Sequence, residues 1–414
     1  MANATLNQYA INDAAACLSI SVETIRRWEK MGLIKSSRDR LNHRVFDIEE
    51  LSLAHQKTNG NHLENNYKVL VSDTRYPATC IDLFAGAGGT ALGFHNAGIK
   101  HVLLAEINQD AVNTLRLNSE SLNLGWNIYE GDVADIDYAG YSVDIIQAGF
   151  PCQAFSYAGK SLGFEDVRGT LFYEFARAIK EVRPKIAIGE NVRGLLSHDN
   201  GKTFKTMIDI LENLGYTTSY MVLRAQYLDV PQKRERLIMF ARQKDLQLPA
   251  VFPIERKYYI SLREALEGCP DSAGQRYTER KHSIMSLIPE GGNWRDLPDE
   301  IQREYMGASY YLGGGKTGMA RRLSWDEPSL TLTCNPAQKQ TERCHPSETR
   351  PLSVREYARI QTFPDEWVFS GSTNSQYKQI GNAVPVNLGY HIGRCVLASL
   401  GYVEIDSQMN AVQI

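Results

Sequence analysis

A cysteine on a proline-containing turn, Cys152 in Phe150-Pro151-Cys152-Gln153, is the residue best placed for covalent chemistry in this chain. The turn directly follows the apolar run 143–147, which is expected to be a strand. A thiol at the carboxyl end of a strand in an α/β sheet stands where such folds bind ligands, and its thiolate is a nucleophile. A buried structural cysteine is the alternative, and this segment alone does not decide between the two.

A glycine-rich loop, Asp82-Leu83-Phe84-Ala85-Gly86-Ala87-Gly88-Gly89, follows an earlier apolar run and opens a helix. Glu106 ends the next expected strand, 20 residues after Gly86, where an acid can bind ribose hydroxyls. A nicotinamide dinucleotide could use such a loop, but position 91 is Ala instead of the third glycine. A second acid, Asp132, stands where the following strand should end, and two such acids favour S-adenosylmethionine. Either acid could instead be a helix cap or a solvated charge.

The elements that must position these residues alternate between strands and helices from residue 79 onward. Apolar runs predict strands at 80–84, 102–105, 143–147, 186–188, 220–223 and 237–240. Apolar side chains at helical spacing predict a helix over 171–182. This alternation predicts an α/β fold with a parallel, doubly wound sheet.

A series of short motifs between residue 79 and about residue 400 resembles, in content and order, the DNA cytosine-5 methyltransferases. The motifs occupy 82–89, 149–153, 168–172, 190–192, 231–236 and 381–385. The resemblance implies a Rossmann-like, S-adenosylmethionine-dependent methyltransferase sheet. It also implies methyl transfer to carbon 5 of a cytosine rotated out of a specific DNA duplex sequence. The enzyme would belong to a prokaryotic restriction-modification system with a companion restriction endonuclease.

The resemblance assigns catalytic roles to Cys152, Glu190, Arg234 and Arg236. The Cys152 thiolate would attack carbon 6 of the base, and Glu190 would give or share a proton at ring nitrogen 3. Arg234 and Arg236 alternate on an extended segment and should face one side, where they could hold the carbonyl oxygen of the base. A surface ion pair with Glu235 is the alternative for the arginines, and a cap or buried ion pair is the alternative for Glu190.

The resemblance also implies a cofactor-binding set for S-adenosylmethionine. Its members are Phe84, Gly86, Gly88, Gly89, Glu106, Ile107, Asp132, Val133, Pro151, Leu171, Asn382 and Ala383. Ile107 departs from the family pattern, because some relatives carry an aromatic residue against the adenine there. We expect no metal, because Cys334, Cys344 and His345 do not form a convincing zinc set.

The N-terminal region has the spacing of a helix-turn-helix. A short helix over 12–18 precedes a tight turn and a second helix over 21–29, with Ser21 as its expected N-cap. Residues 26–44 contain seven Lys or Arg against two acids. This region resembles the winged helix of MerR-type regulators, which implies binding to promoter DNA and autoregulation. A packing or dimerisation module is the alternative.

Composition and resemblance together predict the domain order. It runs 1–56 helix-turn-helix, 57–75 linker, 76–249 catalytic and cofactor-binding domain, 250–350 target-recognition domain, 351–375 hinge and 376–414 return to the catalytic domain. The recognition domain carries cations suited to phosphate or guanine contacts. They are Arg276, Arg280, Lys281, Arg295, Lys316, Arg321 and Arg322.

The overall composition is that of an ordinary soluble protein, with 43% hydrophobic and 22% charged residues. No apolar run has the roughly 18 residues of a membrane span, and seven cysteines without paired spacing indicate a reducing cytoplasm. Two other functions stay open at this point, an RNA cytosine-5 methyltransferase and a catalytically idle DNA-binding regulator. The long region 245–350 favours DNA over RNA, and intact Cys152, Glu190 and Arg236 favour an enzyme.

Overall fold

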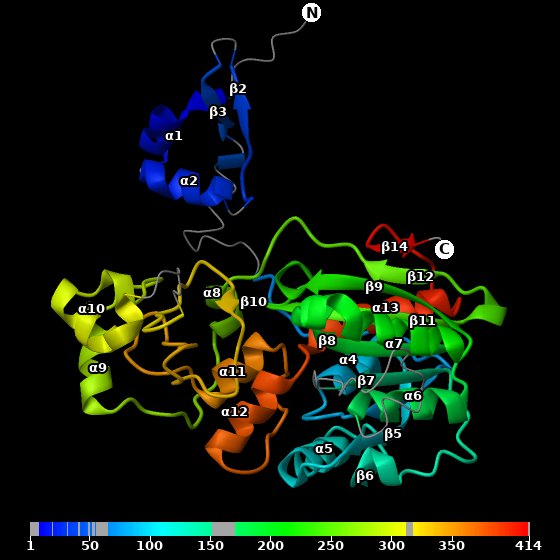
Figure 1. The fold of residues 1–414 in the computed structure, drawn as a ribbon. Helices are drawn as coiled ribbons and strands as arrows, with labels where there is room; N and C mark the ends of the chain where they lie inside the picture. Colours follow the sequence, from blue (N-terminus) through cyan, green and yellow to red (C-terminus); the bar gives the residue numbers. More distant parts are fainter. Residues whose placement is uncertain are drawn as a thin grey trace, which may run out of the picture. The chain divides into compact units, whose positions relative to one another are not determined.

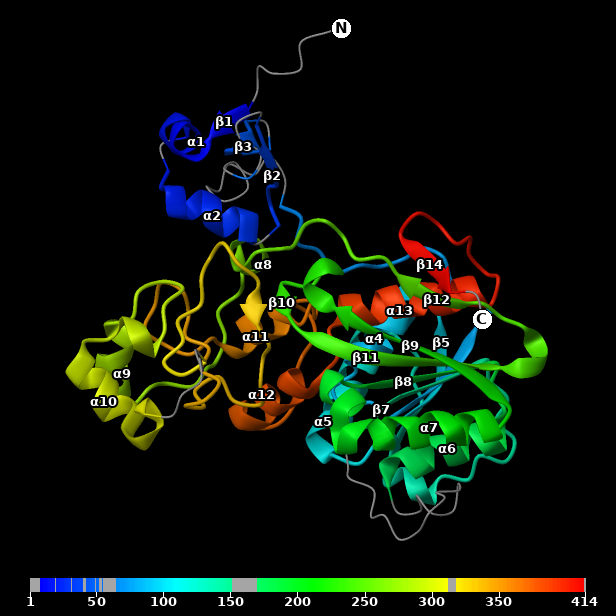
Figure 2. The same ribbon diagram turned by 45° about the horizontal axis from the view of Figure 1, so that its top comes forward.

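The computed structural model describes residues 8–412 except 19, 31, 40–41, 49, 52–53, 55–64, 151–169 and 312–317. The chain divides into two compact units. An N-terminal unit ends at residue 66 and is grouped with residues 256–258, whereas the catalytic unit comprises 67–255 and 259–414. Figures 1 and 2 show the elements of each unit.

The N-terminal unit packs two helices against a small antiparallel sheet of order β1-β3-β2. Its elements are β1 (Gln8–Ala10), α1 (Ile11–Cys17), α2 (Val22–Lys30), β2 (Ser36–Arg38) and β3 (Arg44–Asp47). The Ser21 hydroxyl accepts a hydrogen bond from the Thr24 backbone N–H at 3.1 Å, so the expected N-cap of the second helix is confirmed. Ile25 and Trp28 of α2 are buried with Phe46 of β3 in the core of this unit.

A seven-stranded sheet of order β6-β5-β4-β7-β8-β11-β9 forms the centre of the catalytic unit. Its strands are β4 (Thr79–Leu83), β5 (Lys100–Glu106), β6 (Ile128–Glu130), β7 (Ile145–Gly149), β8 (Ile186–Val192), β9 (Tyr216–Arg224) and β11 (Glu235–Gln243). The expected doubly wound α/β sheet is confirmed, but it is not parallel throughout. Strand β11 runs antiparallel to both β8 and β9. The connection 225–234 is too short for the crossover that a parallel neighbour requires, so β11 turns back beside β9.

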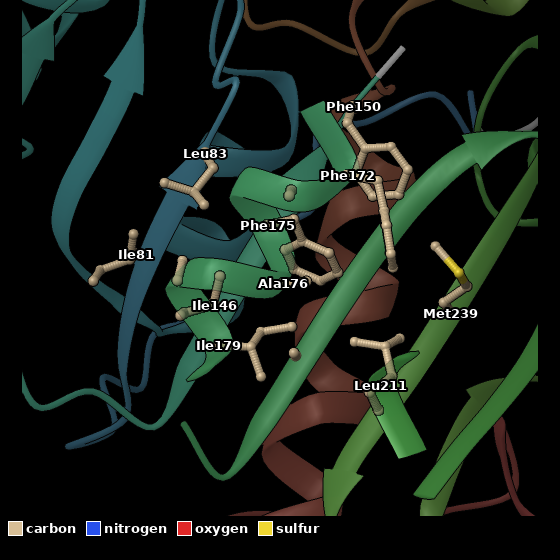
Figure 3. Close-up of a cluster of buried hydrophobic side chains, with 14 of the residues drawn as sticks. Ile81, Leu83, Ile146, Phe150, Phe172, Phe175, Ala176, Ile179, Leu211 and Met239 are labelled. Atoms are coloured by element: carbon tan, nitrogen blue, oxygen red, sulfur yellow. The ribbon is translucent and has the colours of Figure 1, made fainter. Parts of the chain in front are cut away.

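Helices cover both faces of this sheet. The principal ones are α4 (Gly89–Ala97), α5 (Gln109–Ser121), α6 (Leu171–Val182), α7 (Lys202–Asn213) and α13 (Val386–Ser399). Residues of α6 and α7 pack against Ile81 and Ile146 in the cluster drawn in Figure 3. Residues of α4 and α13 pack with Cys80 and Ile145, the neighbours of those residues along the strands. The two core clusters therefore follow from the alternation of side chains along each strand.

A separate cluster of buried side chains lies among residues 277–344, inside the range 250–350 for which the sequence predicts target recognition. We call residues 259–345 the recognition region after that role, which stays a prediction. Met285, Ile288, Trp294, Leu297 and Met306 belong to it. The elements of this region are α8 (Leu262–Leu266), α9 (Glu279–Ser286), α10 (Asp299–Met306) and β13 (Ser329–Leu330), which pairs with β10 (Gln232–Lys233). Figures 1 and 2 show α9 and α10 apart from the sheet, with α11 (Val354–Ile360) and α12 (Thr373–Asn382) between.

Two cations that the sequence suggests as DNA contacts, Arg322 and Lys281, are instead engaged inside this region. The buried Arg322 guanidinium donates to the backbone carbonyls of Ile288 at 2.7 Å and Met285 at 2.8 Å, and to further carbonyls. The Lys281 ammonium lies 2.6 Å from the buried Glu342 carboxylate. Both residues therefore hold the recognition region together.

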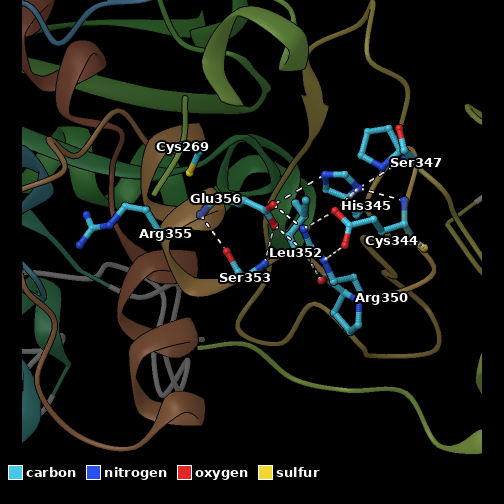
Figure 4. Close-up of polar contacts among 12 residues, drawn as sticks. Cys269, Cys344, His345, Ser347, Arg350, Leu352, Ser353, Arg355 and Glu356 are labelled. Carbon is cyan, nitrogen blue, oxygen red and sulfur yellow. Dashed lines mark hydrogen bonds and ion pairs between the residues drawn. The ribbon is translucent and has the colours of Figure 1, made fainter. Parts of the chain in front are cut away.

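The chain returns from this region through a polar cluster at the start of α11, drawn in Figure 4. Arg350 donates to both carboxylate oxygens of Glu356 at 2.8 Å, and the Ser353 N–H donates to the same carboxylate at 2.6 Å. Burial alone would raise the pKa of Glu356, but these hydrogen bonds hold that pKa below its ordinary value. The cluster ties Arg350 to the first turn of α11.

Residues 67–72, which the sequence assigns to a linker, are docked on the catalytic unit. The Tyr67 hydroxyl donates to the Arg359 carbonyl at 2.9 Å. The Asn387 amide accepts from the Leu70 N–H and donates to the Lys68 carbonyl, each at 2.9 Å. At the other end of the unit, β12 (Ala250–Pro253) pairs with β14 (Met409–Val412). Among the helices in the described ranges, none has the length and apolar character needed to cross a membrane.

Candidate active site

A cavity of about 620 Å³ lies at the carboxyl ends of the parallel strands. Its lining includes these predicted residues: Phe84, Gly86, Gly89, Glu106, Ile107, Glu190, Arg234, Arg236, Asn382 and Ala383. They come from the ends of β4, β5 and β8, from β11 and its preceding loop, and from the end of α12. Predicted residues that are far apart in the sequence thus meet around one space.

Several other predicted residues do not line this cavity. The Asp132 carboxylate accepts from the Ala134 N–H at 2.9 Å and caps a short helix, which is the alternative that the sequence left open. Val133 is buried in the core, and Leu171 opens α6. Pro151 and Cys152 lie outside the described residues, as does Lys316. Their predicted roles stay predictions.

Glu106 joins the glycine-rich loop to the end of β5. One carboxylate oxygen accepts from the Gly86 N–H at 2.8 Å. The other accepts from the N–H groups of Ile107 at 3.0 Å and Asn108 at 2.7 Å. Each carboxylate oxygen has two lone pairs, so the Glu106 oxygen bonded only to Gly86 has capacity left for a ligand hydroxyl.

The glycine-rich loop approaches the C-terminal part of the chain backbone to backbone. A Cβ atom on Gly89 would lie 2.1 Å from the Val384 carbonyl oxygen, so only glycine fits there. Gly88 has φ +85°, and a Cβ atom there would lie 2.8 Å from Leu115. Gly88 therefore serves the packing of the loop, and Gly89 brings the loop against residues 382–384 of the same cavity.

Asp82 and Gln147 are two of the cavity residues that the sequence analysis did not assign to the site. They are direct cross-strand partners on β4 and β7, and both are 1% exposed. The Gln147 amide, with its nitrogen turned toward the carboxyl group, donates to Asp82. Burial, with a contribution from Glu106, raises the pKa of Asp82 well above its ordinary value. The sequence did contain a signal for Asp82, because this acid lies near the end of the first strand and begins the glycine-rich motif 82–89.

Glu190 and Arg236 form an ion pair within the cavity wall. The Arg236 Nε lies 2.5 Å from a Glu190 carboxylate oxygen, and each side chain is 13% exposed. A Cβ atom on Gly149 would lie 3.3 Å from the other Glu190 oxygen, so this carboxylate lies against the end of β7. Asn191 donates to the Phe150 carbonyl at 2.8 Å. The pair therefore sits beside the end of β7, the strand that precedes Cys152 in the sequence.

Arg234 is a buried cation that also lines the cavity. Its guanidinium donates to the Gly381 carbonyl at 3.2 Å, and its Nε has no partner among the described residues. Burial and the neighbouring Arg236 lower the pKa of Arg234 to about 9. The surface ion pair with Glu235 does not form, because the Glu235 carboxylate pairs with Arg193 at 2.9 Å.

A second cavity, of about 570 Å³, shares Arg234 and Arg236 with the first. Further cations in its lining are Arg193, Arg224 and Lys233. Lys233 lies 2.7 Å from Glu327 of the recognition region. A concave surface rich in arginine and lysine suits contact with an anionic polymer such as nucleic acid.

The sheet order, the glycine-rich loop and the acid that closes β5 define a Rossmann-like methyltransferase. The family model described as "C-5 cytosine-specific DNA methylase" matches residues 78–397, and the chain belongs to that family. It is therefore an enzyme that transfers a methyl group from S-adenosylmethionine to cytosine in DNA. The family assignment supports neither the RNA nor the idle-regulator alternative.

Curated relatives are similar over most of their length. The Type II methyltransferase M.Eco47II of Escherichia coli is 52% identical, over 97% of this chain and 98% of the relative. M.PspPI of a Psychrobacter strain is 48% identical over the same shares. M.Sau96I of Staphylococcus aureus is 48% identical over 76% of this chain and 75% of the relative.

Solved structures share the fold. An E. coli prophage protein described as a DNA modification methyltransferase aligns with a TM-score of 0.56 and 22% identity, over 78% of this chain and 99% of that one. A DNMT2 mutant of Spodoptera frugiperda aligns with a TM-score of 0.50 and 18% identity, over 77% of this chain and 99% of that one.

Residues 11–46 match the MerR family of regulatory proteins, which confirms the expected helix-turn-helix type.

Proposed function

We propose that this enzyme methylates cytosine within one specific duplex sequence and so protects DNA in a restriction-modification system, in the cytoplasm and alongside a companion endonuclease. The support is the near full-length similarity to the two Type II methyltransferases M.Eco47II and M.PspPI. The similarity includes the N-terminal unit, because 97% of this chain is covered in each case.

The first cavity fits S-adenosylmethionine by the chemistry of its lining. Glu106 offers acceptor capacity for ribose hydroxyls, and the 66% exposed Ile107 offers an apolar surface for the adenine. Asp82 places a buried carboxyl group where a cationic ligand would favour its ionised form. S-adenosylmethionine supplies an electrophilic methyl group when it is bound.

The chain's own residues then supply the rest of the reaction. The Cys152 thiolate forms a bond to carbon 6 of the cytosine, and Glu190 holds or gives a proton at ring nitrogen 3. Carbon 5 takes the methyl group and loses its proton to a base, after which the thiol leaves carbon 6. Arg236 keeps Glu190 in place and faces the carbonyl oxygen of the base. The observation that carries this assignment is the Glu190–Arg236 pair beside Gly149.

A mechanism-based trap tests the assignment. Bisulfite sequencing of DNA from cells that express the chain gives the target sequence. A duplex with 5-fluorocytosine at the target, incubated with S-adenosylmethionine, should form a covalent adduct that survives denaturation, because after methyl transfer the fluorine on carbon 5 cannot leave as a cation. Cys152→Ser should form no adduct and lose methyl transfer while it still binds S-adenosylmethionine. An active enzyme that gives no adduct would exclude addition at carbon 6.

A second function, control of transcription, is supported by the N-terminal unit. Helix α2 buries Ile25 and Trp28, whereas Arg26, Arg27 and Lys30 are exposed. A helix with a basic exposed face suits the major groove of DNA. We therefore include binding to promoter DNA, with repression of its own gene, as part of the proposal. DNase footprinting of the full-length protein on the upstream region tests it, and an unprotected region would refute it.

A further inference from the structure

Two buried glutamines, Gln232 and Gln361, form an amide pair behind the wall of the cofactor cavity. Gln232 begins β10, and Gln361 directly follows α11. Both are 0% exposed, and the Gln232 Nε2 donates to the Gln361 Oε1 at 2.8 Å. Neither side chain lines the cavity, so neither can touch a ligand in it.

Each amide is tied at its other end to a part of the functional site. The Gln361 Nε2 donates to the carbonyls of Ile380 at 2.6 Å and Ala383 at 3.0 Å. These two carbonyls flank Asn382, which with Ala383 lines the cofactor cavity. Gln361 thus bonds two carbonyls at the end of α12, and Arg234 donates to a third, that of Gly381.

The Gln232 Oε1 accepts from the Leu332 N–H at 3.0 Å, and Leu332 belongs to the recognition region just after β13. The same oxygen lies 3.5 Å from an Nη of Arg234. Leu332 and Arg234 also meet directly, because that guanidinium lies 3.5 Å from the Leu332 carbonyl. One buried network thus joins the recognition backbone, the buried arginine and the cofactor wall.

The amide orientations in this network are fixed. The Gln361 Nε2 uses both of its hydrogens on carbonyls, so a rotated amide would bring its oxygen against two acceptors. Leaving a buried amide without hydrogen-bond partners is unfavourable, so the parts of this network resist moving separately. A displacement of the α12 end is resisted by Gln361, Gln232 and the groups bonded to them.

We propose that Gln232 and Gln361 are positioning residues that couple the cofactor cavity to DNA engagement. Cofactor binding fixes the α12 end, and this fixes Arg234 and the Leu332 backbone in the arrangement that DNA requires. The coupling must be reciprocal, so bound DNA tightens cofactor binding by the same factor. The proposal rests on the roles proposed above for Arg234, Asn382 and Ala383.

Equilibrium binding tests the coupling without turnover. The probe is S-adenosylhomocysteine, titrated calorimetrically into the full chain with and without an unmethylated duplex of the mapped target sequence. In the wild type, DNA should tighten binding by about 5-fold or more. Gln361→Met and Gln232→Met should each remove most of that enhancement and change affinity without DNA much less. The double variant should match the single variants, because both remove the same link.

Gln243→Met is the matched control. Its Nε2 donates to the Arg183 carbonyl at 2.7 Å, and it lies at the far end of β11 from the cavity. This variant should keep the full enhancement by DNA. If Gln361→Met lowers the melting temperature but keeps the enhancement, the pair is only structural and the proposal fails. The proposal also fails if the wild type shows no enhancement, whereas failure of the proposed chemistry would appear separately, as absent adduct formation with 5-fluorocytosine.

Discussion

The Glu190 carboxylate is bound on one side by Arg236 and lies on the other against Gly149, at the end of the strand that precedes the proposed nucleophile Cys152. We expect Glu190→Gln to keep DNA binding but to slow the single-turnover rate by about 100-fold or more, because an amide cannot supply the proton at ring nitrogen 3. Rapid-quench assays measure this rate. Glu235→Gln is the control, since Glu235 makes only an exposed pair with Arg193 and its loss should leave the rate unchanged. A near-normal rate for Glu190→Gln would refute the proton role.

Much of the site was predictable from the sequence through its short motifs. Glu190 and Arg236 each stand in such a motif, and the structure brings them to 2.5 Å from each other. The contact between Asp82 and Gln147 was not predicted because it depends on which strands are neighbours and on the register between β4 and β7. The two segments are more than 60 residues apart, so neither segment alone specifies that pairing.

Among the elements, strand periodicity gave the position of β11 but not its direction. A strand has the same apolar pattern whether it runs parallel or antiparallel to its neighbour. Only the short connection 225–234 therefore indicated that β11 is antiparallel. The start of α2 in the N-terminal unit was easier to predict, because Ser21 caps this helix through a purely local hydrogen bond. The polar network of Gln232 and Gln361 was invisible in the sequence, since its members are separated by 129 positions.

His101 on β5 should make the stability of the catalytic unit depend on pH. It is 2% exposed, and neither ring nitrogen has a partner among the described residues. Burial, with His95 nearby, lowers its pKa to about 3. In the unfolded chain this imidazole binds a proton below a pH of about 6.5, so the free energy of unfolding falls as the pH drops from there toward 3.

Urea unfolding at pH 7 and pH 5 measures this effect. His101→Phe should reduce the loss of stability between the two pH values by about 2 kcal/mol, since each pKa unit corresponds to about 1.4 kcal/mol. His282→Phe is the control, because His282 is exposed and its replacement should leave the pH dependence as it is. An unchanged pH dependence in His101→Phe would mean that this histidine is not buried as a neutral group.

For the whole molecule, we expect target methylation and promoter binding to reside in different units. A chain that begins at Asn65 should methylate the mapped target at a rate within about 2-fold of the full chain and lose binding to promoter DNA. The reason is that the cavities, their lining residues and the recognition core all lie in the catalytic unit. Electrophoretic mobility shifts and a methylation assay on one preparation measure both. Loss of target methylation in a folded truncated chain would assign the N-terminal unit to catalysis instead.

The full-length variant with Arg26→Ala and Arg27→Ala is the matched control for that truncation. Both arginines are exposed on α2, opposite the buried Ile25 and Trp28, so their removal should leave the unit folded. Promoter binding should fall while methylation persists. Unchanged promoter binding would move the contact to another face of the unit.

The contacts of residues 67–72 with the catalytic unit determine where the enzyme could be fused to a different regulatory domain. The Asn387 amide binds the Lys68 carbonyl and the Leu70 N–H, and also donates to the Asp229 carbonyl at 2.7 Å. A cut after residue 70 would strip two of these bonds from a side chain in a buried position, and would damage α13 beside the cofactor wall. A catalytic fragment for use in fusions should therefore begin before Tyr67, and any chimera should keep residues 67–72 with the catalytic unit.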